Sequence, residues 1–374
     1  MSSKLKIHVV SFDVPWPDNY GGVIDVFHKL RHLHALGAEI VLHAFTYGRQ
    51  PADQLKQYCS EVHYYPRKHS RWLLFQRPPF IVSSRVHDQL IHRIHSDEGA
   101  VLLEGLHCTA QFKEMQQRSR MVMVRAHNVE HDYYRQLAVS EKNIFRRVYL
   151  EQEANKLELY EPQVMEHLTV AALSTNDYSY FSQRYPRVMQ VNAFHPNDRV
   201  DILPGRGKYF LYQGNLGVSE NRAAAEWLLR EVVPHLKFPL IIAGQKIPTE
   251  MIQHYKSPAV HFEQHPTAAR MDELISEAQV HLLPATQNTG IKLKLLNALF
   301  RGRHVVANTD MCNEGWLQEI CHIADQPVDF AAAANEQFIR AFEISDIRKR
   351  EDILQSYASN ERAAKQLFTA LQTS

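Results

Sequence analysis

The feature that most constrains the fold is a repeated alternation of short apolar strands with helical stretches. Near the N-terminus, residues 7–12 are predicted as a strand, 23–36 as a helix with apolar side chains at helical spacing, and 39–45 as the next strand. Gly37 follows the helix, where a left-handed cap is expected. A strand–helix–strand unit of this kind belongs to a parallel sheet. The sequence therefore predicts an α/β protein.

The same plan begins a second time near residue 208, and 374 residues are too many for one ordinary core. We therefore expect a first domain over residues 1–200 and a second over 207–345, followed by C-terminal helices over 346–374. The polar segment 197–207, with its proline and glycines, is the expected linker. Further strands are predicted at 101–103, 121–124, 169–173, 209–213, 239–243, 260–262, 280–283 and 304–307.

Charge and cysteine content exclude several classes of protein. Lys plus Arg number 42 and Asp plus Glu 41, so no global field attracts nucleic acid, and no nucleic-acid partner is expected. Four scattered cysteines, without a C-x-x-C pair, indicate a reducing compartment. The chain passes directly into its first strand, and no apolar run approaches the roughly 20 residues that span a bilayer. A cytoplasmic protein is the expectation, with the inner face of the membrane as a further location.

Ligands of open α/β sheets bind beyond the carboxyl ends of the strands, where loops and helix N-termini present N–H groups. The first such loop contains Gly21 and Gly22, which would let the backbone approach a ligand closely. It lacks the G-x-G-x-x-G pattern of dinucleotide-binding proteins. A simple pair of loop glycines is the equally weighted alternative. For Ser219, near the start of the second plan, we predict a helix N-cap.

A second loop, residues 125–131, follows the strand 121–124 and reads Arg-Ala-His-Asn-Val-Glu-His. His127 and His131 match H-x-x-E-H, in which both histidines bind zinc from one helical face. His127 directly follows a strand, however, and is expected in a turn. Contact with a substrate hydroxyl is therefore the preferred interpretation, and no metal site is predicted. Asn128 and Glu130 are expected on the acceptor side of the same site.

Two further acceptor-side candidates, Glu104 and His107, follow the strand 101–103. Ordinary polar loop residues are their alternative interpretation. The third loop begins at residue 284, contains Gly290, and leads into a helix predicted over 291–300. At about 100° per residue, Lys294, Asn297 and Arg301 share one face of that helix, which suits a ligand surface or a solvated face.

These segments together resemble the glycosyltransferases of the GT-B fold, and among them the large retaining family 4, as a divergent branch. His127 matches the active-site histidine of that family, and Gly21-Gly22 resembles its glycine loop. Residues 289–302, Thr-Gly-Ile-Lys-Leu-Lys-Leu-Leu-Asn-Ala-Leu-Phe-Arg-Gly, match its segment G-x-x-x-K-x-x-E-A-x-x-x-G. Residues 209–229 resemble the opening of the donor domain, and 360–371 the tail that crosses back. The resemblance implies two Rossmann-like parallel-sheet domains facing across a cleft.

The resemblance also implies roles for single residues. His127 and Lys294 would be catalytic. Donor binding would involve Gly22, Gly214, Asn215, Asn221, Thr289, Gly290, Lys292 and Asn297. The family commonly has an Arg and a Lys at the positions of Asn215 and Asn221, and glutamates at those of Thr289 and Asn297. The neutral side chains leave Lys294, with Lys292 and helix N-termini, to neutralise a diphosphate.

The activity implied is transfer of a sugar from a nucleotide diphosphate sugar to a hydroxyl of a carbohydrate or lipid-linked acceptor. Retention of configuration, no metal and no cofactor are expected, in polysaccharide biosynthesis. Two alternatives stay open: a nucleotide-sugar epimerase of the same fold, and a degenerate, non-catalytic binding subunit. The basic and aromatic stretch 65–77 is suited to peripheral contact with a membrane, with a solvated loop and helix as its alternative.

Overall fold

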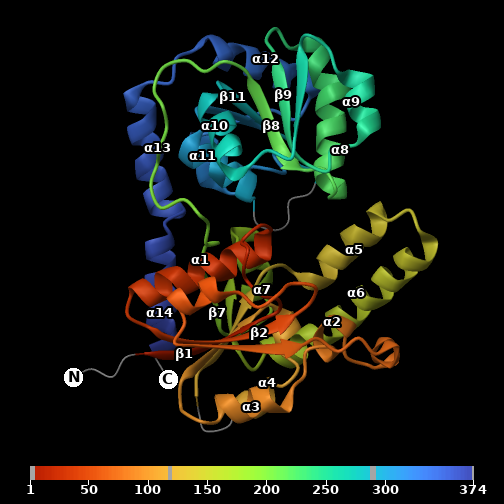
Figure 1. The fold of residues 1–374 in the computed structure, drawn as a ribbon, viewed down its shortest axis with the longest axis vertical. Coiled ribbons are helices and arrows are strands. Elements are labelled where there is room, and N and C mark those ends of the chain that lie inside the picture. The colour runs from red at the N-terminus through yellow and green to blue at the C-terminus, as the bar shows by residue number, and fades with distance from the viewer. Residues whose placement is uncertain (1–4, 117–119, 287–291, 373–374) are drawn as a thin grey trace. The chain divides into compact units, whose positions relative to one another are not determined.

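A computed structural model describes residues 5–116, 120–286 and 292–372 of the chain. Contacts divide these residues into two compact units, both drawn in Figure 1. Unit 1 runs to Pro196 and resumes at Ser359, and unit 2 runs from Asn197 to Ala358. The expected linker, residues 197–207, contains neither helix nor strand. The two parallel sheets described below confirm the predicted fold class.

Unit 1 is built on a parallel sheet. Within the described residues it has seven strands in the order β3-β2-β1-β4-β5-β6-β7, and every neighbouring pair is parallel. The order reverses between β1 and β4, which is where such sheets bind ligands. The strands are β1 (Lys6–Ser11), β2 (Glu39–Thr46), β3 (Glu61–Pro66), β4 (Ala100–Glu104), β5 (Val122–Ala126), β6 (Thr169–Ala172) and β7 (Val188–Gln190).

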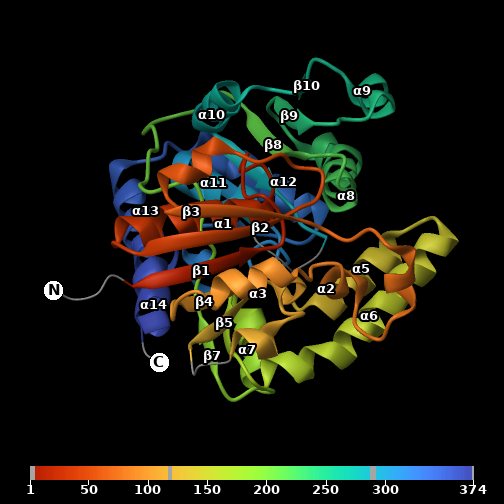
Figure 2. The same ribbon diagram turned by 60° about the horizontal axis from the view of Figure 1, so that its bottom comes forward.

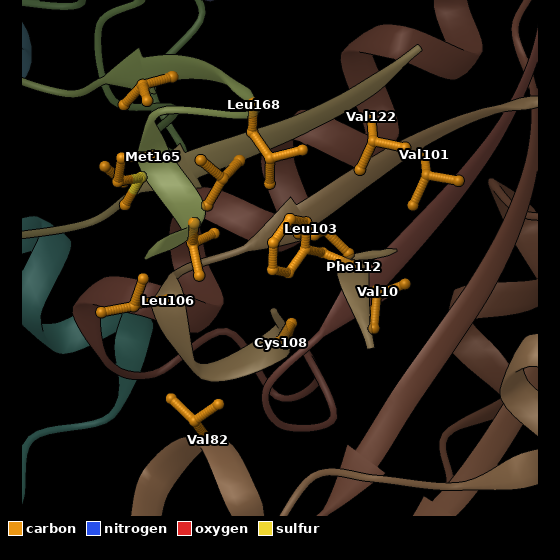
Figure 3. Close-up of a cluster of buried hydrophobic side chains, with 14 of the residues drawn as sticks. Val10, Val82, Val101, Leu103, Leu106, Cys108, Phe112, Val122, Met165 and Leu168 are labelled. Atoms are coloured by element: carbon orange, nitrogen blue, oxygen red, sulfur yellow. The ribbon is translucent and has the colours of Figure 1, made fainter. Parts of the chain in front are cut away.

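Helices cover both faces of this sheet, because its strands bury apolar side chains on both sides. One face packs against α2, α3, α4, α6 and α7. Figure 3 shows part of this cluster, with Val10, Leu103 and Val122 of the strands beside Phe112 of α4. The helices of unit 1 are α1 (Gly21–Ala35), α2 (Phe80–Ser83), α3 (Asp88–Ile94), α4 (Phe112–Met115), α5 (Glu130–Ser140), α6 (Ile144–Met165), α7 (Thr175–Ser182) and α14 (Asn360–Gln372), with short turns η1 (Asp53–Gln57), η2 (Arg71–Phe75) and η3 (Leu106–Cys108).

The other face of the sheet is covered by α1 and by the C-terminal helix α14. Leu367 and Leu371 of α14 pack into the same cluster as Val26 and Leu30 of α1. Asn360, at the start of α14, accepts a hydrogen bond from the backbone N–H of residue 195 at 3.1 Å and donates one to its carbonyl at 2.8 Å. The last helix of the chain therefore crosses back to unit 1, as predicted.

Unit 2 repeats the plan with a smaller sheet. The described part of the unit has six strands in the order β10-β9-β8-β11-β12-β13, again with parallel neighbours. The order reverses between β8 and β11. The strands are β8 (Phe210–Asn215), β9 (Leu240–Gln245), β10 (Val260–Gln264), β11 (Val280–Leu283), β12 (His304–Ala307) and β13 (His322–Ile323).

The helices of unit 2 also lie on both faces of their sheet. Helices α8, α9 and α12 pack on one face, and α10, α11 and α13 on the other. The expected segment 346–374 is thus divided, because α13 packs in unit 2 and α14 in unit 1. The helices are α8 (Ser219–Trp227), α9 (Thr249–Tyr255), α10 (Ala268–Glu277), α11 (Leu293–Arg301), α12 (Pro327–Ile339) and α13 (Ile344–Tyr357), with turns η4 (Leu228–Val232), η5 (Val233–His235) and η6 (Gly315–Glu319).

Local predictions are confirmed at one helix end and wrong at another. Gly37 has a φ of 89°, which confirms the left-handed end of α1. Ser219 is not the N-cap of α8, because a turn from Asn215 to Val218 places Val218 in that position and Ser219 in the first turn. Among the described residues, no helix has the length and apolar character needed to cross a membrane.

A chain of buried hydrogen bonds crosses β1, β2 and β3. His8 Nδ1 lies 2.9 Å from His43 Nε2, His43 Nδ1 lies 2.9 Å from the Tyr65 hydroxyl, and His8 Nε2 lies 2.8 Å from Asp97 Oδ1. Burial lowers the pKa of His8, and it lowers the pKa of His43 well below the usual value for histidine. Both imidazoles are therefore neutral in the folded protein at neutral pH.

This chain predicts that unit 1 loses stability in mild acid. Below about pH 6.5 the histidines of the unfolded chain bind protons, while those of the folded protein stay neutral. The free energy of unfolding therefore falls below that pH, with a slope that approaches about 1.4 kcal/mol per pH unit for each histidine. Thermal unfolding of the wild type between pH 7.5 and 5 should show it, and His43→Gln should show a smaller slope. The exposed His92→Gln should keep the wild-type slope. Equal slopes for all three proteins would contradict the prediction.

Candidate functional site

The first cluster of polar groups lies where β4 and β5 end, at the reversal of the unit 1 sheet. Glu104 is the last residue of β4, and His127 is the first residue after β5, in the connection to α5 and outside any helix, as expected. His127 Nε2 lies 2.9 Å from Glu104 Oε2, and both side chains are buried. The structure thus brings together a predicted catalytic residue and a predicted acceptor-side residue.

Glu104 belongs to a larger network of buried charges that ties α1 to the sheet. Lys29 Nζ of α1 donates to Glu104 Oε2 and to Asp25 Oδ2, both at 2.8 Å. Arg125 of β5 donates from Nη2 to Asp25 Oδ1 at 3.0 Å. Burial alone would raise the pKa of Asp25, but Arg125 and Lys29 together hold that pKa below its usual range. Two cations and two carboxylates therefore balance one another inside the unit.

Within the described residues, Asp25, Glu104 and His127 offer three ligand atoms within 4.8 Å of one another, as a metal site would. The Lys29 ammonium, however, already bridges the two carboxylates. A divalent ion bound there would have to displace this buried cation. The pattern H-x-x-E-H does not converge on a metal either, because His131 Nε2 bonds the Tyr180 hydroxyl at 2.8 Å.

The partners of His127 determine what its ring can do. A carboxylate only accepts hydrogen bonds, so Nε2 carries the hydrogen that it donates to Glu104. In the neutral tautomer this leaves Nδ1 as an acceptor. That buried Nδ1 has no hydrogen-bond partner, and neither has the second oxygen of Glu104, Oε1. Buried polar atoms without partners are rare, so both are suited to bind groups of a ligand.

His107 and Glu130 form a second pair of buried polar groups in unit 1. His107 Nδ1 lies 3.8 Å from Glu130 Oε1, too far for a hydrogen bond, and both atoms lack partners. Burial raises the pKa of Glu130 to about 8, with Glu161 nearby adding to the effect, so its carboxyl group holds a proton at pH 7. Burial lowers the pKa of His107 well below its usual value. Asn128 hydrogen-bonds Glu130, so three of the four predicted acceptor-side residues, His107, Asn128 and Glu130, lie in this region.

The glycine loop at the start of α1 has a structural explanation. A Cβ at Gly22 would lie 2.6 Å from the Phe12 ring, so a larger residue would force that ring to move. Phe12 also contacts both histidines, with ring centroids 5.4 Å from His107 and 5.4 Å from His127. Its ring therefore forms an apolar wall beside the unpartnered imidazole nitrogens. At Gly21, a Cβ would meet no atom within 4 Å.

The second cluster lies in unit 2, where α8 and α11 begin. Lys294 Nζ donates to Asn221 Oδ1 at 3.0 Å and lies 5.4 Å from the centre of the Tyr212 ring. Asn221 in turn donates from Nδ2 to the carbonyl of Asn215, at the end of β8, at 3.1 Å. The Asn221 side chain therefore holds Lys294, and the backbone carbonyl of Asn215 holds Asn221.

Lys292 lies at the same end of α11, with Nζ 3.6 Å from Glu220 Oε1. Burial lowers the pKa of Lys294 to about 8, and burial also lowers the pKa of Lys292, although Glu220 opposes the shift in both cases. Two partly buried ammonium groups lie beside Glu220, with Asp310 as a weaker influence on Lys292, and such a pair of cations can bind an added anion. Coulomb attraction to such an anion is strong because water is largely excluded.

The structure describes two further predicted donor residues, Gly214 and Asn297. A Cβ at Gly214 would lie 3.3 Å from the Asn221 side chain, so glycine makes room for the Asn221 side chain. Asn297 accepts a hydrogen bond from Asn197 at 2.9 Å. Thr289 and Gly290 lie outside the described residues.

Lys29, Asp25 and Glu220 were not predicted as site residues. Asp25 and Lys29, four residues apart in α1, look like an ordinary surface ion pair of a helix. Glu220 looks like a typical acidic residue in a first helical turn. The available signal lay in Glu104 and Arg125, which are charges inside apolar strands and need buried partners.

A family model described as glycosyl transferases group 1 matches residues 207–338, which lie in unit 2. Residues 207–338 are therefore similar to the glycosyl transferases of group 1, and the chain has the GT-B fold. A curated relative, an uncharacterised 44.6 kDa protein in the cps region of Klebsiella pneumoniae, is 25% identical over 332 residues, covering 83% of this chain and 84% of the relative.

Two solved structures share the fold. WaaG, a glycosyltransferase involved in lipopolysaccharide biosynthesis, has a TM-score of 0.61 at 12% identity, with 99% of this chain and 100% of that chain covered. A variant of TarM of S. aureus in complex with Fondaparinux, alpha-GlcNAc-glycerol and UDP has a TM-score of 0.64 at 10% identity, with 99% and 100% covered. The resemblance to glycosyltransferases predicted from the sequence is confirmed.

The buried network of unit 1 predicts a double-mutant effect. Lys29→Met should destabilise unit 1 by about 3–5 kcal/mol, because Glu104 and Asp25 lose their shared cation. Adding Glu104→Gln removes one orphaned carboxylate and should restore part of the loss. Urea unfolding of the two single variants and the double variant measures this coupling. If the two losses simply add, Lys29 and Glu104 do not stabilise each other.

Proposed function

We propose that the protein transfers a sugar from a nucleotide diphosphate sugar to a hydroxyl group of a carbohydrate or lipid-linked acceptor. The bond from the anomeric carbon to the β-phosphate oxygen breaks, and a bond to the acceptor oxygen forms. The proton of the acceptor hydroxyl passes to the departing phosphate. Following the resemblance to family 4, we propose retention of anomeric configuration.

The observation that carries this proposal is the pair of partly buried lysines, Lys292 and Lys294, in the domain that matches the group 1 family. Charge develops on the β-phosphate as the sugar leaves, and fixed cations in a site with little water stabilise that charge. UDP, which the TarM variant binds, presents such a diphosphate. Asn221 orients Lys294, so an Asn in place of the family's lysine is compatible with activity.

We propose that the unit 1 cluster recognises hydroxyl groups. His127 Nδ1 and Glu104 Oε1 can accept hydrogen bonds from sugar hydroxyls, since neither has another partner. Glu130, protonated at pH 7, can donate one. No metal takes part in this proposal, because the Lys29 ammonium bridges the carboxylates that a metal would need. The cps-region relative and the role of WaaG support a setting in surface polysaccharide biosynthesis.

Lys294→Ala should weaken binding of a nucleoside diphosphate about tenfold to a hundredfold, because the variant loses one charge-assisted hydrogen bond to the phosphates. Lys292→Ala should do less, because Glu220 already offsets its charge. Glu220→Gln should tighten binding by removing a competing carboxylate. Calorimetric titration with the diphosphate measures each effect, and the unphosphorylated nucleoside should bind all four proteins equally.

The pH dependence provides a control for this prediction. Lys294 with a pKa of about 8 loses its proton above that pH, so wild-type affinity for the diphosphate should fall from pH 8 upwards. The remaining affinity of Lys294→Ala should fall less over that range. Unchanged affinity in Lys294→Ala would show that this lysine does not hold the phosphates.

His127→Ala should abolish sugar transfer while leaving the thermal midpoint near that of the wild type, because Nδ1 is needed for the substrate and not for the core. His131→Ala is the matched control, since His131 bonds Tyr180 instead. Transfer should be assayed with excess chelator present, which the wild type should tolerate. Turnover of His127→Ala near the wild-type rate would remove His127 from the active site, and wild-type activity lost to the chelator and restored by zinc would contradict metal independence.

A further inference from the structure

One surface of unit 1 consists of exposed apolar side chains from two segments. The first is the turn η2, where Trp72 is 80% exposed and Phe75 82% exposed. The second is the tip of the hairpin formed by α5 and α6, where Val139 is 80%, Ile144 62% and Phe145 85% exposed. Large side chains are rarely exposed in groups without a binding role.

The two segments are connected through α6. Lys156 Nζ donates to the carbonyl of Leu74 in η2 at 2.6 Å, and Glu153 accepts from the backbone N–H of Phe80 at 2.6 Å. Phe145 precedes Lys156 by eleven residues, which is about three turns plus 20°, so both lie on the same face of α6, roughly 16 Å apart. Both views of the chain draw α5 and α6 as a hairpin that extends away from the sheet of unit 1 (Figures 1 and 2).

The charge around these side chains is positive. Residues 62–87 contain Arg67, Lys68, Arg71, Arg77 and Arg85 and no Asp or Glu. Of these, Lys68 and Arg77 are exposed beside η2. The hairpin tip adds Lys142, Arg146 and Arg147, all exposed, against Glu141 and Glu151.

We propose that this surface, residues 68–77 together with 139–148, docks on an anionic lipid bilayer. Trp and Phe side chains are favoured at the membrane interface, and neighbouring Lys and Arg are attracted to acidic headgroups. A second copy of the chain is a poorer occupant, because it would bring the same cations against each other. The docking does not depend on the reaction catalysed. That it brings a lipid-linked acceptor to the enzyme rests on the proposed function.

The test is sedimentation of the full-length protein with vesicles of phosphatidylcholine alone, or with about a third phosphatidylglycerol. We expect binding only to the anionic vesicles, and weaker binding as salt increases. Trp72→Ser with Phe75→Ser should lower the partition coefficient about tenfold or more. Lys68→Gln with Arg77→Gln should lower it about 25-fold, at about fivefold for each cation. The control, Ile344→Ser, removes an apolar side chain of unit 2 that is 58% exposed and should bind like the wild type.

Three results would overturn the proposal. One is no binding to anionic vesicles at low salt. Another is equal loss of binding in the Ile344→Ser control and the η2 variants. The third is a wild-type dimer that becomes monomeric in the η2 variants, while these variants still bind vesicles like the wild type. That result would show that the surface binds a second copy of the chain. Because the variants lie outside the candidate site, they should transfer sugar to a water-soluble acceptor at the wild-type rate. If the wild type itself transfers no sugar, that result counts against the proposed function and not against membrane docking.

Discussion

The ion network of Lys29, Asp25, Glu104 and Arg125 is the interaction on which the functional edge of unit 1 depends. It joins α1 to β4 and β5 at the reversal of strand order, and Asp25 also accepts a hydrogen bond from the backbone N–H of Phe194. Such a network adds little stability compared with an apolar core, but removing one member is costly. A shift of α1 along the sheet would leave these buried charges without partners, so the network favours the observed packing of α1.

The two units share one sheet plan but carry different polar groups where the strand order reverses. Reversal of strand order opens a crevice at the carboxyl ends of the strands, and the side chains that follow those strands determine its chemistry. In unit 1 the charges are neutralised internally, which leaves hydrogen-bonding atoms of His127 and Glu104 available. In unit 2 burial lowers the pKa of two lysines beside Glu220, so an added anion would stabilise their charged forms. The candidate site of unit 1 thus offers hydrogen-bond acceptors, and that of unit 2 offers cations.

The central strands of both sheets could be predicted from the sequence because they are buried on both faces and form apolar runs. Of the edge strands, β10 was predicted at 260–262, but β3, β7 and β13 were not. β3 contains His63 and other half-exposed residues, β7 has three half-exposed residues, and β13 has two. An edge strand buries less surface, so its pattern is hard to distinguish from that of a loop. The sequence thus predicts the fold class and the strands that bear the site, while sheet width depends on tertiary pairing.

The positions of the candidate site residues could be predicted from the sequence, but their hydrogen-bond and ion-pair partners could not. His127 and Glu104 were found because each ends a strand, and a parallel sheet gathers such ends at one edge. The tautomer of His127, however, depends on Glu104, and the charge of Glu104 is balanced by Lys29, which is 75 residues away along the chain. No local pattern separates Lys29 from the exposed lysines of other helices. The chemistry of the site is therefore set by long-range pairing of charges that the sequence shows only as misplaced polar residues in apolar strands.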